Sequence, residues 1–285
     1  MLLLAPLRGV TIRTFREVFA KEIVEAGFEE AITPFITAIS GFNPLKDREL
    51  SGGKSGLPIT PQFIGKDPAA FRECLKRVRE AGYKTADLNC GCPYPMVLNQ
   101  GRGSGLMRTP DVLRRMLEVG CEEMGAGNFS VKTRLGVERS EELLSLLPLL
   151  NQYPLRFLTV HGRVAKQMYE GKCDEKAMAE VIAAAKVPII LNGDLTVGEK
   201  RPEVHGIMVG RSFIRSLGER ENIGELLFNY IDSSQAELCG ERPVLGRMKE
   251  LVAYWQTSPR WHRRWRTLKL ARTIDELKSV ISGGR

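Results

Sequence analysis

The chain has 285 residues, of which 43% are hydrophobic and 27% charged, so it has the composition of a globular protein and is neither disordered nor fibrous. Its apolar runs are far shorter than the about 20 residues that span a bilayer, and its six cysteines are not spaced like a disulfide framework. The net charge is +8, yet the first 240 residues are nearly neutral, whereas residues 241–285 carry 11 basic and 4 acidic side chains.

These features predict a reduced, cytoplasmic protein without a membrane segment. The N-terminal sequence MLLLAPLRG has no basic region before its three leucines, so we expect no signal peptide.

Short apolar runs alternate with amphipathic stretches along the first 230 residues. Strands are predicted at 2–6, 30–35, 61–65, 86–89, 129–133, 157–160, 188–191 and 206–209. Helices are predicted at 11–26, 67–81, 109–124, 140–147, 174–186 and 223–231, and loops at 40–57 and from the CGCP sequence to residue 105. The helix at 67–81 has a strong start signal, because Asp67 is a good N-cap and Pro68 follows it.

Strands that are separated by helices pair in parallel, and eight such units in about 230 residues favour a TIM (β/α)8 barrel. A doubly wound sheet is the alternative, but no G-x-G-x-x-G sequence follows the first strand. About 14 residues, including Gly198 and Pro202, separate the last two strands. We therefore expect the seventh unit to lack a full helix.

The C-terminal part is predicted to form a second, smaller unit. We expect a barrel domain at 1–232, a linker at 233–243 and a small helical domain at 244–285, with helices at 246–256, 260–271 and 274–281. The excess of basic residues predicts a polyanionic partner such as a nucleic acid, with a solvated helical face as the alternative.

Polar motifs follow most of the predicted strands, namely APLRG, Gln62, NCGCP, KTRLG, HGR, NGD and GR. Taken singly, each residue has a structural alternative. Lys132 could form an ion pair at the barrel rim, His161 could be a hydrogen-bonded histidine there, and Gly193 and Gly210 could be turn glycines. Because the carboxyl ends of barrel strands meet at one face, the whole set predicts a single active site there.

The order of these motifs, with DLNCGCP, GRGSGLM, TVHGR and NGD along the barrel, resembles the tRNA-dihydrouridine synthase family of flavoenzymes. The resemblance implies a TIM barrel with tightly bound, non-covalent FMN, NADPH as the reductant, and a helical domain that helps to hold tRNA. The implied reaction is reduction of the C5–C6 bond of a tRNA uridine to dihydrouridine.

The resemblance also assigns the cofactor residues. Gln62, Lys132 and His161 are implied to contact the flavin, and Pro6, Leu7 and Arg8 to line its ring. The loops after the last two strands are a common phosphate site in barrels, and here they contain Asn192, Gly193, Asp194, Gly210 and Arg211. Glycine lets backbone N–H groups approach a phosphate, and arginine supplies charge.

Cys92, in GCP, is implied to be the catalytic acid that protonates C5 of the uracil, because a thiol with an ordinary pKa near 8.5 stays protonated at neutral pH. Cys90 and Cys92 could instead bind a metal, but no second Cys/His pair has suitable spacing, so no metal is expected. Asn89 is expected to orient the uracil edge, and Arg163 to contact the substrate.

The basic side chains expected to bind the tRNA backbone are Arg260, Arg263, Arg264, Arg266 and Lys269. Trp261 and Trp265 lie four residues apart, which favours a buried stripe that docks the helix over stacking on bases. The chain departs from the family at Tyr94-Pro95-Met96, where lysines are common, and at Leu7, where methionine is common.

Two other functions fit parts of this pattern. A flavin barrel that reduces a free pyrimidine would not need the basic C-terminal part, and a non-catalytic RNA-binding barrel would not need Cys92 with a complete FMN set. No obligate protein partner is expected. The sequence specifies neither the target uridine, nor NADPH over NADH, nor the oligomeric state.

Overall fold

The computed structural model describes residues 1–50 and 56–283, and its strands form one parallel sheet. Of the loop predicted at 40–57, residues 51–55 therefore lie outside the described part. In the described residues the strands are β1 Leu2–Leu4, β2 Glu30–Ile32, β3 Ile36–Thr37, β4 Ile59–Thr60, β5 Gln62–Ile64, β6 Ala86–Cys90, β7 Phe129–Arg134, β8 Leu158–His161, β9 Ile189–Asn192 and β10 Gly206–Val209.

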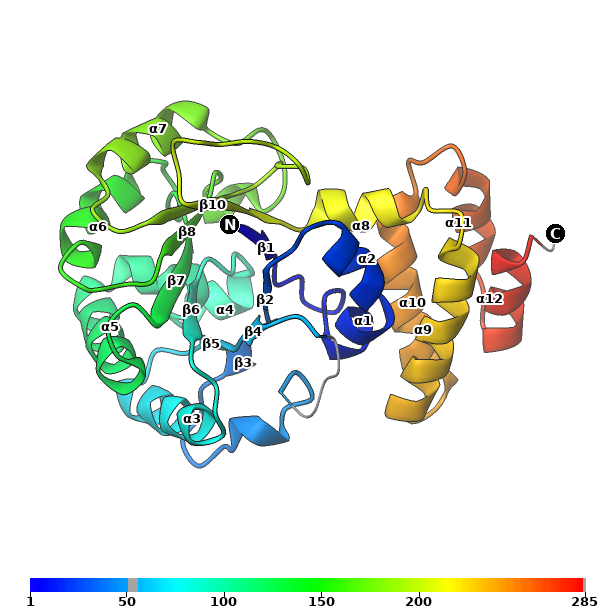
Figure 1. Ribbon diagram of the computed structural model, residues 1–285, viewed down its shortest axis with the longest axis horizontal. Helices are drawn as coiled ribbons and strands as arrows, with labels where there is room; N and C mark the ends of the chain where they lie inside the picture. Colours follow the sequence, from blue (N-terminus) through cyan, green and yellow to red (C-terminus); the bar gives the residue numbers. More distant parts are fainter. Residues whose placement is uncertain (51–55, 284–285) are drawn as a thin grey trace.

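The sheet closes on itself as a barrel (Figure 1). β1 pairs with β10 on one side and with β2 on the other, and β2 pairs with β4. Only Pro61 separates β4 from β5, and β5 pairs with both β3 and β6. β2 and β3 together form one interrupted strand, and so do β4 and β5. Counted in this way, the barrel has eight strands in the residues that the structure describes. The predicted TIM barrel is confirmed.

Helices surround the barrel and continue into a C-terminal group (Figure 1). The described helices are α1 Arg13–Val18, α2 Ala20–Glu25, α3 Pro68–Glu80, α4 Pro95–Asn99, α5 Pro110–Met124, α6 Glu142–Leu150, α7 Glu175–Ala184, α8 Arg211–Leu217, α9 Ile223–Glu237, α10 Glu241–Val252, α11 His262–Leu268 and α12 Ile274–Ile281. Among them, none has the length and apolar character that crossing a bilayer requires.

Some local predictions are confirmed, and two elements differ from their predicted form. Asp67 caps α3 by accepting a hydrogen bond from the N–H of Ala69. The stretch between β9 and β10, which is fully described, contains no helix, as its length predicted. The helix predicted at 11–26 is divided in two at Phe19, whose backbone leaves helical geometry. The loop after CGCP contains the short helix α4 and a 3-10 helix at Gly103–Arg108.

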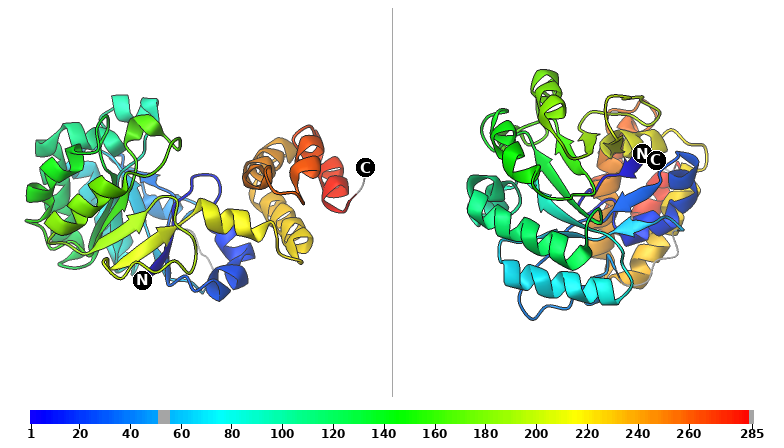
Figure 2. Two further views of the ribbon diagram at one scale, coloured as in Figure 1. Left: turned by 90° about the horizontal axis from the view of Figure 1, so that it is seen from above. Right: turned by 60° about the vertical axis from the view of Figure 1, so that its left-hand side comes forward.

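Helices α9 to α12 form what we call the helical lobe, which lies beside the barrel with α8 between them (Figure 2). The linker predicted at 233–243 is wrong in its local structure, because α9 continues to Glu237 and α10 begins at Glu241. Pro243 does not prevent this, since it lies in the first turn of α10, where no N–H is needed for the helix. The division of the chain into two domains stays a prediction.

Two tryptophans fix the helical lobe to the barrel. Trp255 and Trp261 are fully buried, with ring centroids 4.8 Å apart. Their indole N–H groups donate to backbone oxygens of the α8 segment, Trp255 to Ile214 at 2.6 Å and Trp261 to Gly218 at 2.7 Å. The packing role predicted for Trp261 is therefore confirmed, and Trp265 is half-buried against the same core.

Candidate active site

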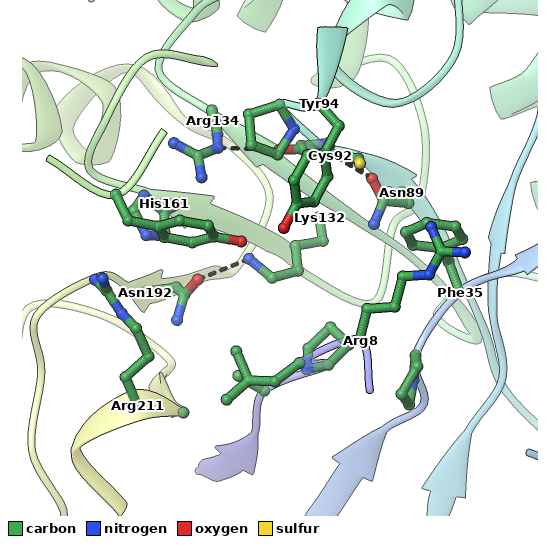
Figure 3. Close-up of a pocket in the computed structure, with 18 of the residues that line it drawn as sticks. Arg8, Phe35, Asn89, Cys92, Tyr94, Lys132, Arg134, His161, Asn192 and Arg211 are labelled. Carbon is green, nitrogen blue, oxygen red and sulfur yellow. Dashed lines mark hydrogen bonds between the residues drawn. The ribbon is translucent and has the colours of Figure 1, made fainter. Parts of the chain in front are cut away.

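A cavity of about 270 Å³ opens at the carboxyl ends of the strands (Figure 3). Strand-end residues from most of the ring line it, as barrel geometry predicts. The sequence-predicted residues on its wall are Pro6, Leu7, Arg8, Asn89, Cys92, Lys132, His161, Asn192, Gly193, Gly210 and Arg211. The structure thus brings most of the expected flavin set and the expected catalytic thiol into one cavity.

Cys92 lies on the wall of this cavity, where it is 6% exposed. Burial raises the pKa of its thiol, so the group holds its proton at neutral pH. Asn89 fixes the backbone beside it, because its side-chain oxygen accepts from the N–H of Cys92 at 2.9 Å and of Gly91 at 3.1 Å. The arrangement can present a protonated thiol to a bound substrate.

Lys132 and His161 form a second wall. Lys132 donates from Nζ to the side-chain oxygen of Asn192 at 2.7 Å, and burial lowers the pKa of this lysine to about 7. Burial, with Lys132 and Arg134 nearby, also lowers the pKa of His161 well below its ordinary value, so its imidazole is neutral. The buried Nδ1 atom of His161 has no hydrogen-bond partner in the protein, which leaves it for a ligand.

Arg211 lies at the start of α8. Its guanidinium carbon is 5.0 Å from the centre of the Tyr169 ring, and its Nη2 atom is 2.9 Å from Oδ1 of Asp194. Asp194 is outside the cavity wall and holds Arg211 together with Arg163. The predicted substrate contact of Arg163 is not supported, because this side chain is buried and donates to Asp194 and to the backbone oxygens of Glu170 and Gly171. Its hydrogen-bonding capacity is used inside the protein.

The flavin contact of Gln62 stays a prediction, because the structure places this side chain behind the cavity wall. Its side chain is fully buried and does not line the cavity. Instead it joins Asn89 to Asp87 through hydrogen bonds of 2.8 Å on either side. In the structure Gln62 therefore supports the cavity wall from behind.

The wall also contains residues that were not predicted as site residues, among them Phe35, Arg134, Tyr169, Glu250 and Tyr254. Arg134 belongs to the KTRLG motif, so its position after a strand could have identified it; its guanidinium donates to the backbone oxygen of Gly91 at 3.0 Å. Glu250 and Tyr254 come from the helical lobe, which no local pattern relates to the barrel. The Glu250 carboxylate packs over Gly9, whose φ of 80° suits glycine and where a Cβ atom would lie 2.4 Å from it.

The predicted basic set in the helical lobe does not share one role. Arg260 precedes α11 and donates to the backbone oxygen of Arg220 at 2.8 Å, while Arg264 lies over the ring of Trp261 at 5.5 Å. Arg263, Arg266 and Lys269 are exposed. Two of the five side chains thus take part in packing or docking. The helix predicted at 260–271 spans only His262–Leu268, which leaves Arg260 outside it.

Three features of the cavity fit the FMN predicted from the sequence. The unpartnered His161 nitrogen and Lys132 offer polar contacts from one side. Arg211 offers a positive charge next to two close-packed glycines. A Cβ atom on Gly193 would lie 2.5 Å from the Cys173 sulfur, and one on Gly210 would lie 3.0 Å from Ala5. No group of three or more potential metal ligands occurs in the residues that the structure describes.

Comparisons with known proteins agree with this geometry. Residues 3–216 match the family model described as dihydrouridine synthase. A probable tRNA-dihydrouridine synthase of Rhodobacter capsulatus is 29% identical over 81% of this chain and 72% of its own. One from Helicobacter pylori is 30% identical over 89% of this chain and 82% of its own.

Among solved structures, an old yellow enzyme homologue from Zymomonas mobilis matches with a TM-score of 0.55, at 14% identity, over 75% of this chain and 85% of that chain. Morphinone reductase matches with a TM-score of 0.54 at 11% identity, over 75% and 82% of the two chains. At such low identity these two matches show the barrel fold alone.

Proposed function

Because this chain belongs to the dihydrouridine synthase family, we propose that it is a tRNA-dihydrouridine synthase, which reduces the C5–C6 bond of a tRNA uridine using FMN and NADPH. The observation that carries the proposal is the protonated thiol of Cys92 on the wall of the cavity that gathers the expected flavin residues. The relatives in Rhodobacter and Helicobacter, whose names state this substrate, support it.

In this proposal Gly193, Gly210 and Arg211 hold the phosphate of FMN, and Asn192 keeps Lys132 in place beside the ring. Pro6 and Leu7 provide apolar contact for the ring from the end of β1. When bound and reduced, FMN supplies the hydride that C6 of the uracil requires.

Cys92 donates the proton that C5 requires, which completes the addition of two hydrogens across the double bond. Burial keeps this proton on the sulfur until a substrate carbon takes it, and the resulting thiolate regains a proton from solvent after the product leaves. Arg134 and Asn89 hold the backbone at Gly91 and Cys92, so the thiol stays in one position.

The helical lobe completes the proposal. Glu250 and Tyr254 bring it to the edge of the cavity, and the exposed Arg263, Arg266 and Lys269 offer positive charge for the tRNA backbone. We also keep the predicted division into a catalytic barrel and an RNA-holding helical unit as part of this proposal.

Replacing Cys92 with alanine tests the function. We expect Cys92→Ala to retain bound FMN and NADPH oxidation but to form dihydrouridine in tRNA at least about 100-fold more slowly, the usual loss when a general acid is removed. Cys90→Ala is the matched control, because Cys90 is buried in β6 outside the cavity lining and should remain active. The measurements are the flavin spectrum, NADPH oxidation and dihydrouridine content of tRNA.

An inactive Cys90→Ala beside an active Cys92→Ala would contradict the assignment of the acid. A wild-type protein that purifies without flavin, or that reduces free uridine as readily as tRNA, would overturn the function itself.

A further inference from the structure

A chain of buried side chains leads from Asp87 to the Cys92 backbone. The Asp87 carboxylate accepts from the Gln62 side-chain N–H at 2.8 Å, and the Gln62 oxygen accepts from the Asn89 side-chain N–H at 2.8 Å. The Asn89 oxygen then accepts from the N–H groups of Gly91 and Cys92. Asp87 and Gln62 are fully buried, and Asn89 is 7% exposed.

Both ends of this chain fix the direction of its bonds, because the Asp87 carboxylate accepts and the backbone N–H groups of Gly91 and Cys92 can only donate. An ionised carboxylate can only accept, so the amide nitrogen of Gln62 must face it and the amide oxygen must face Asn89. That oxygen in turn requires the amide nitrogen of Asn89, which leaves the Asn89 oxygen for the two backbone N–H groups. If either amide were reversed, buried donors would face donors, which is costly in a protein interior.

We propose that Asp87 is a positioning residue, which through Gln62 holds the Asn89 side chain in place, so that the Asn89 oxygen supports the Cys92 backbone and its nitrogen is available to substrate. The substrate role of this proposal rests on the proposed function. Figure 3 shows the Asn89 side chain pointing into the cavity with its oxygen toward Cys92. An N–H group there can donate to a carbonyl oxygen of uracil. It cannot donate to the exocyclic amino group of cytosine, which is itself a donor.

The Asp87 carboxyl is mostly ionised at neutral pH, although it is fully buried. Burial raises the pKa of its carboxyl to about 6, while hydrogen bonds from Ser130 and Gln62 and the charge of Lys132 act in the opposite direction. The other groups facing it are Glu30 and Cys90, and Ser130 donates to the second carboxylate oxygen at 2.6 Å. Ser130 also lies 3.5 Å from the backbone oxygen of Ala86, to which its hydrogen could turn.

This geometry predicts different outcomes for two substitutions at one position. Asp87→Leu removes the acceptor of the Gln62 amide, so Gln62 is no longer held in the orientation in which it accepts from Asn89. Asp87→Asn keeps one oxygen for Gln62, and its new amide nitrogen can donate to Ser130 Oγ, whose own hydrogen turns to Ala86. Ser130→Ala is the matched control, because it removes a hydrogen bond from the same carboxylate but leaves the acceptor for Gln62.

The first readout is the rate at which N-ethylmaleimide modifies Cys92 in the purified protein, followed by peptide mass spectrometry, which separates Cys92 from the other cysteines. In Asp87→Leu the Asn89 side chain is held less firmly, so its two hydrogen bonds to the backbone at 91–92 weaken, and the modification rate should rise by about tenfold. Asp87→Asn and Ser130→Ala should stay within about threefold of wild type. The second readout is dihydrouridine formation, which should fall by about tenfold in Asp87→Leu while NADPH oxidation is retained.

An equal effect of Ser130→Ala and Asp87→Leu on the modification rate would overturn the proposal. It would mean that any substitution in this buried part of the barrel exposes Cys92 to the reagent. If Asp87→Leu does not fold, Gln62→Met interrupts the same chain one residue closer to Cys92, and an unchanged modification rate in that variant would also overturn it. The modification rate needs no turnover, so a wild type that forms no dihydrouridine would contradict the proposed function and leave this test intact.

Discussion

Lys132 lies at the carboxyl end of the barrel, where burial lowers the pKa of its ammonium group from an ordinary 10.5 to about 7, with Arg134 acting in the same direction. In the free protein its charge is therefore partly lost above neutral pH. A ligand that places a hydrogen-bond acceptor or a negative charge beside Lys132 would favour the charged form and raise this pKa again. Binding of such a ligand must then take up a proton, and its affinity must fall as pH rises above 7.

We therefore expect FMN to bind more weakly as pH rises from 7.5 to 9, by up to about tenfold per pH unit, because Lys132 must gain a proton on binding. The phosphate of FMN is already ionised in this range, so it adds little to the slope. Lys132→Met should bind FMN more weakly and with almost no pH dependence. Quenching of flavin fluorescence measures both affinities, and equal slopes in the two proteins would exclude Lys132 as the titrating group.

The sequence predicted most of the site residues because they directly follow strands, and parallel strands of a barrel end at one face. Arg163 also follows this rule, whereas Gln62 begins β5, and the side chains of both are used inside the protein. Their partners are the backbone at 170–171 and the buried Asp87, and no local pattern relates these groups to the two side chains. Glu250 and Tyr254 could not be predicted, since their place on the cavity wall depends on how the helical lobe docks.

At the scale of elements, α8 was missed although it joins the site to the helical lobe. It begins at Arg211, directly after β10 and Gly210, and it has no side-chain cap that would signal its start. Its other end, at Gly218, receives the two buried tryptophans. The strands and outer helices, by contrast, were predicted well because they carry complete amphipathic or apolar patterns of their own.

Gly218 tests this docking, since a Cβ atom there would lie 2.7 Å from the Trp255 ring. We expect Gly218→Ala to lower the free energy of unfolding by about 1–3 kcal/mol, because the buried ring must move. Gly246→Ala is the matched control, since Gly246 lies within α10 with nothing within 4 Å of a Cβ atom. That control should raise stability by about 0.5–1 kcal/mol.

Urea denaturation followed by tryptophan fluorescence measures both changes. A Gly218→Ala protein as stable as the Gly246→Ala protein would mean that the Trp255 ring can move away from α8 without a loss in the free energy of unfolding. The helical lobe would then be held to the barrel mainly elsewhere, for example by the hydrogen bond that the Thr14 hydroxyl donates to the Glu237 carboxylate.

At the scale of the whole molecule, most of the net charge lies in the lobe that borders the cavity. Residues 241–285 carry nearly all of the net positive charge, and the same segment contributes Glu250 and Tyr254 to the cavity wall. A polyanion bound to this lobe would therefore be held next to the proposed catalytic thiol. Since Arg260 and Arg264 take part in docking and packing, the side chains that remain exposed for it are Arg263, Arg266 and Lys269.

Contacts with phosphates are independent of base sequence, and each one increases the magnitude of the slope of log affinity against log salt by roughly one. We expect Arg263→Ala/Arg266→Ala to weaken tRNA binding and to reduce this slope by up to about two, with FMN content and NADPH oxidation unchanged. The control is Lys21→Ala/Lys176→Ala, which removes the same charge from exposed barrel positions with side-chain exposures of 78% and 90%. Filter binding of tRNA across a salt series gives both slopes. Equal losses in the two double variants would mean that net charge alone attracts the RNA, and an unchanged slope in the first would place the RNA on the barrel instead.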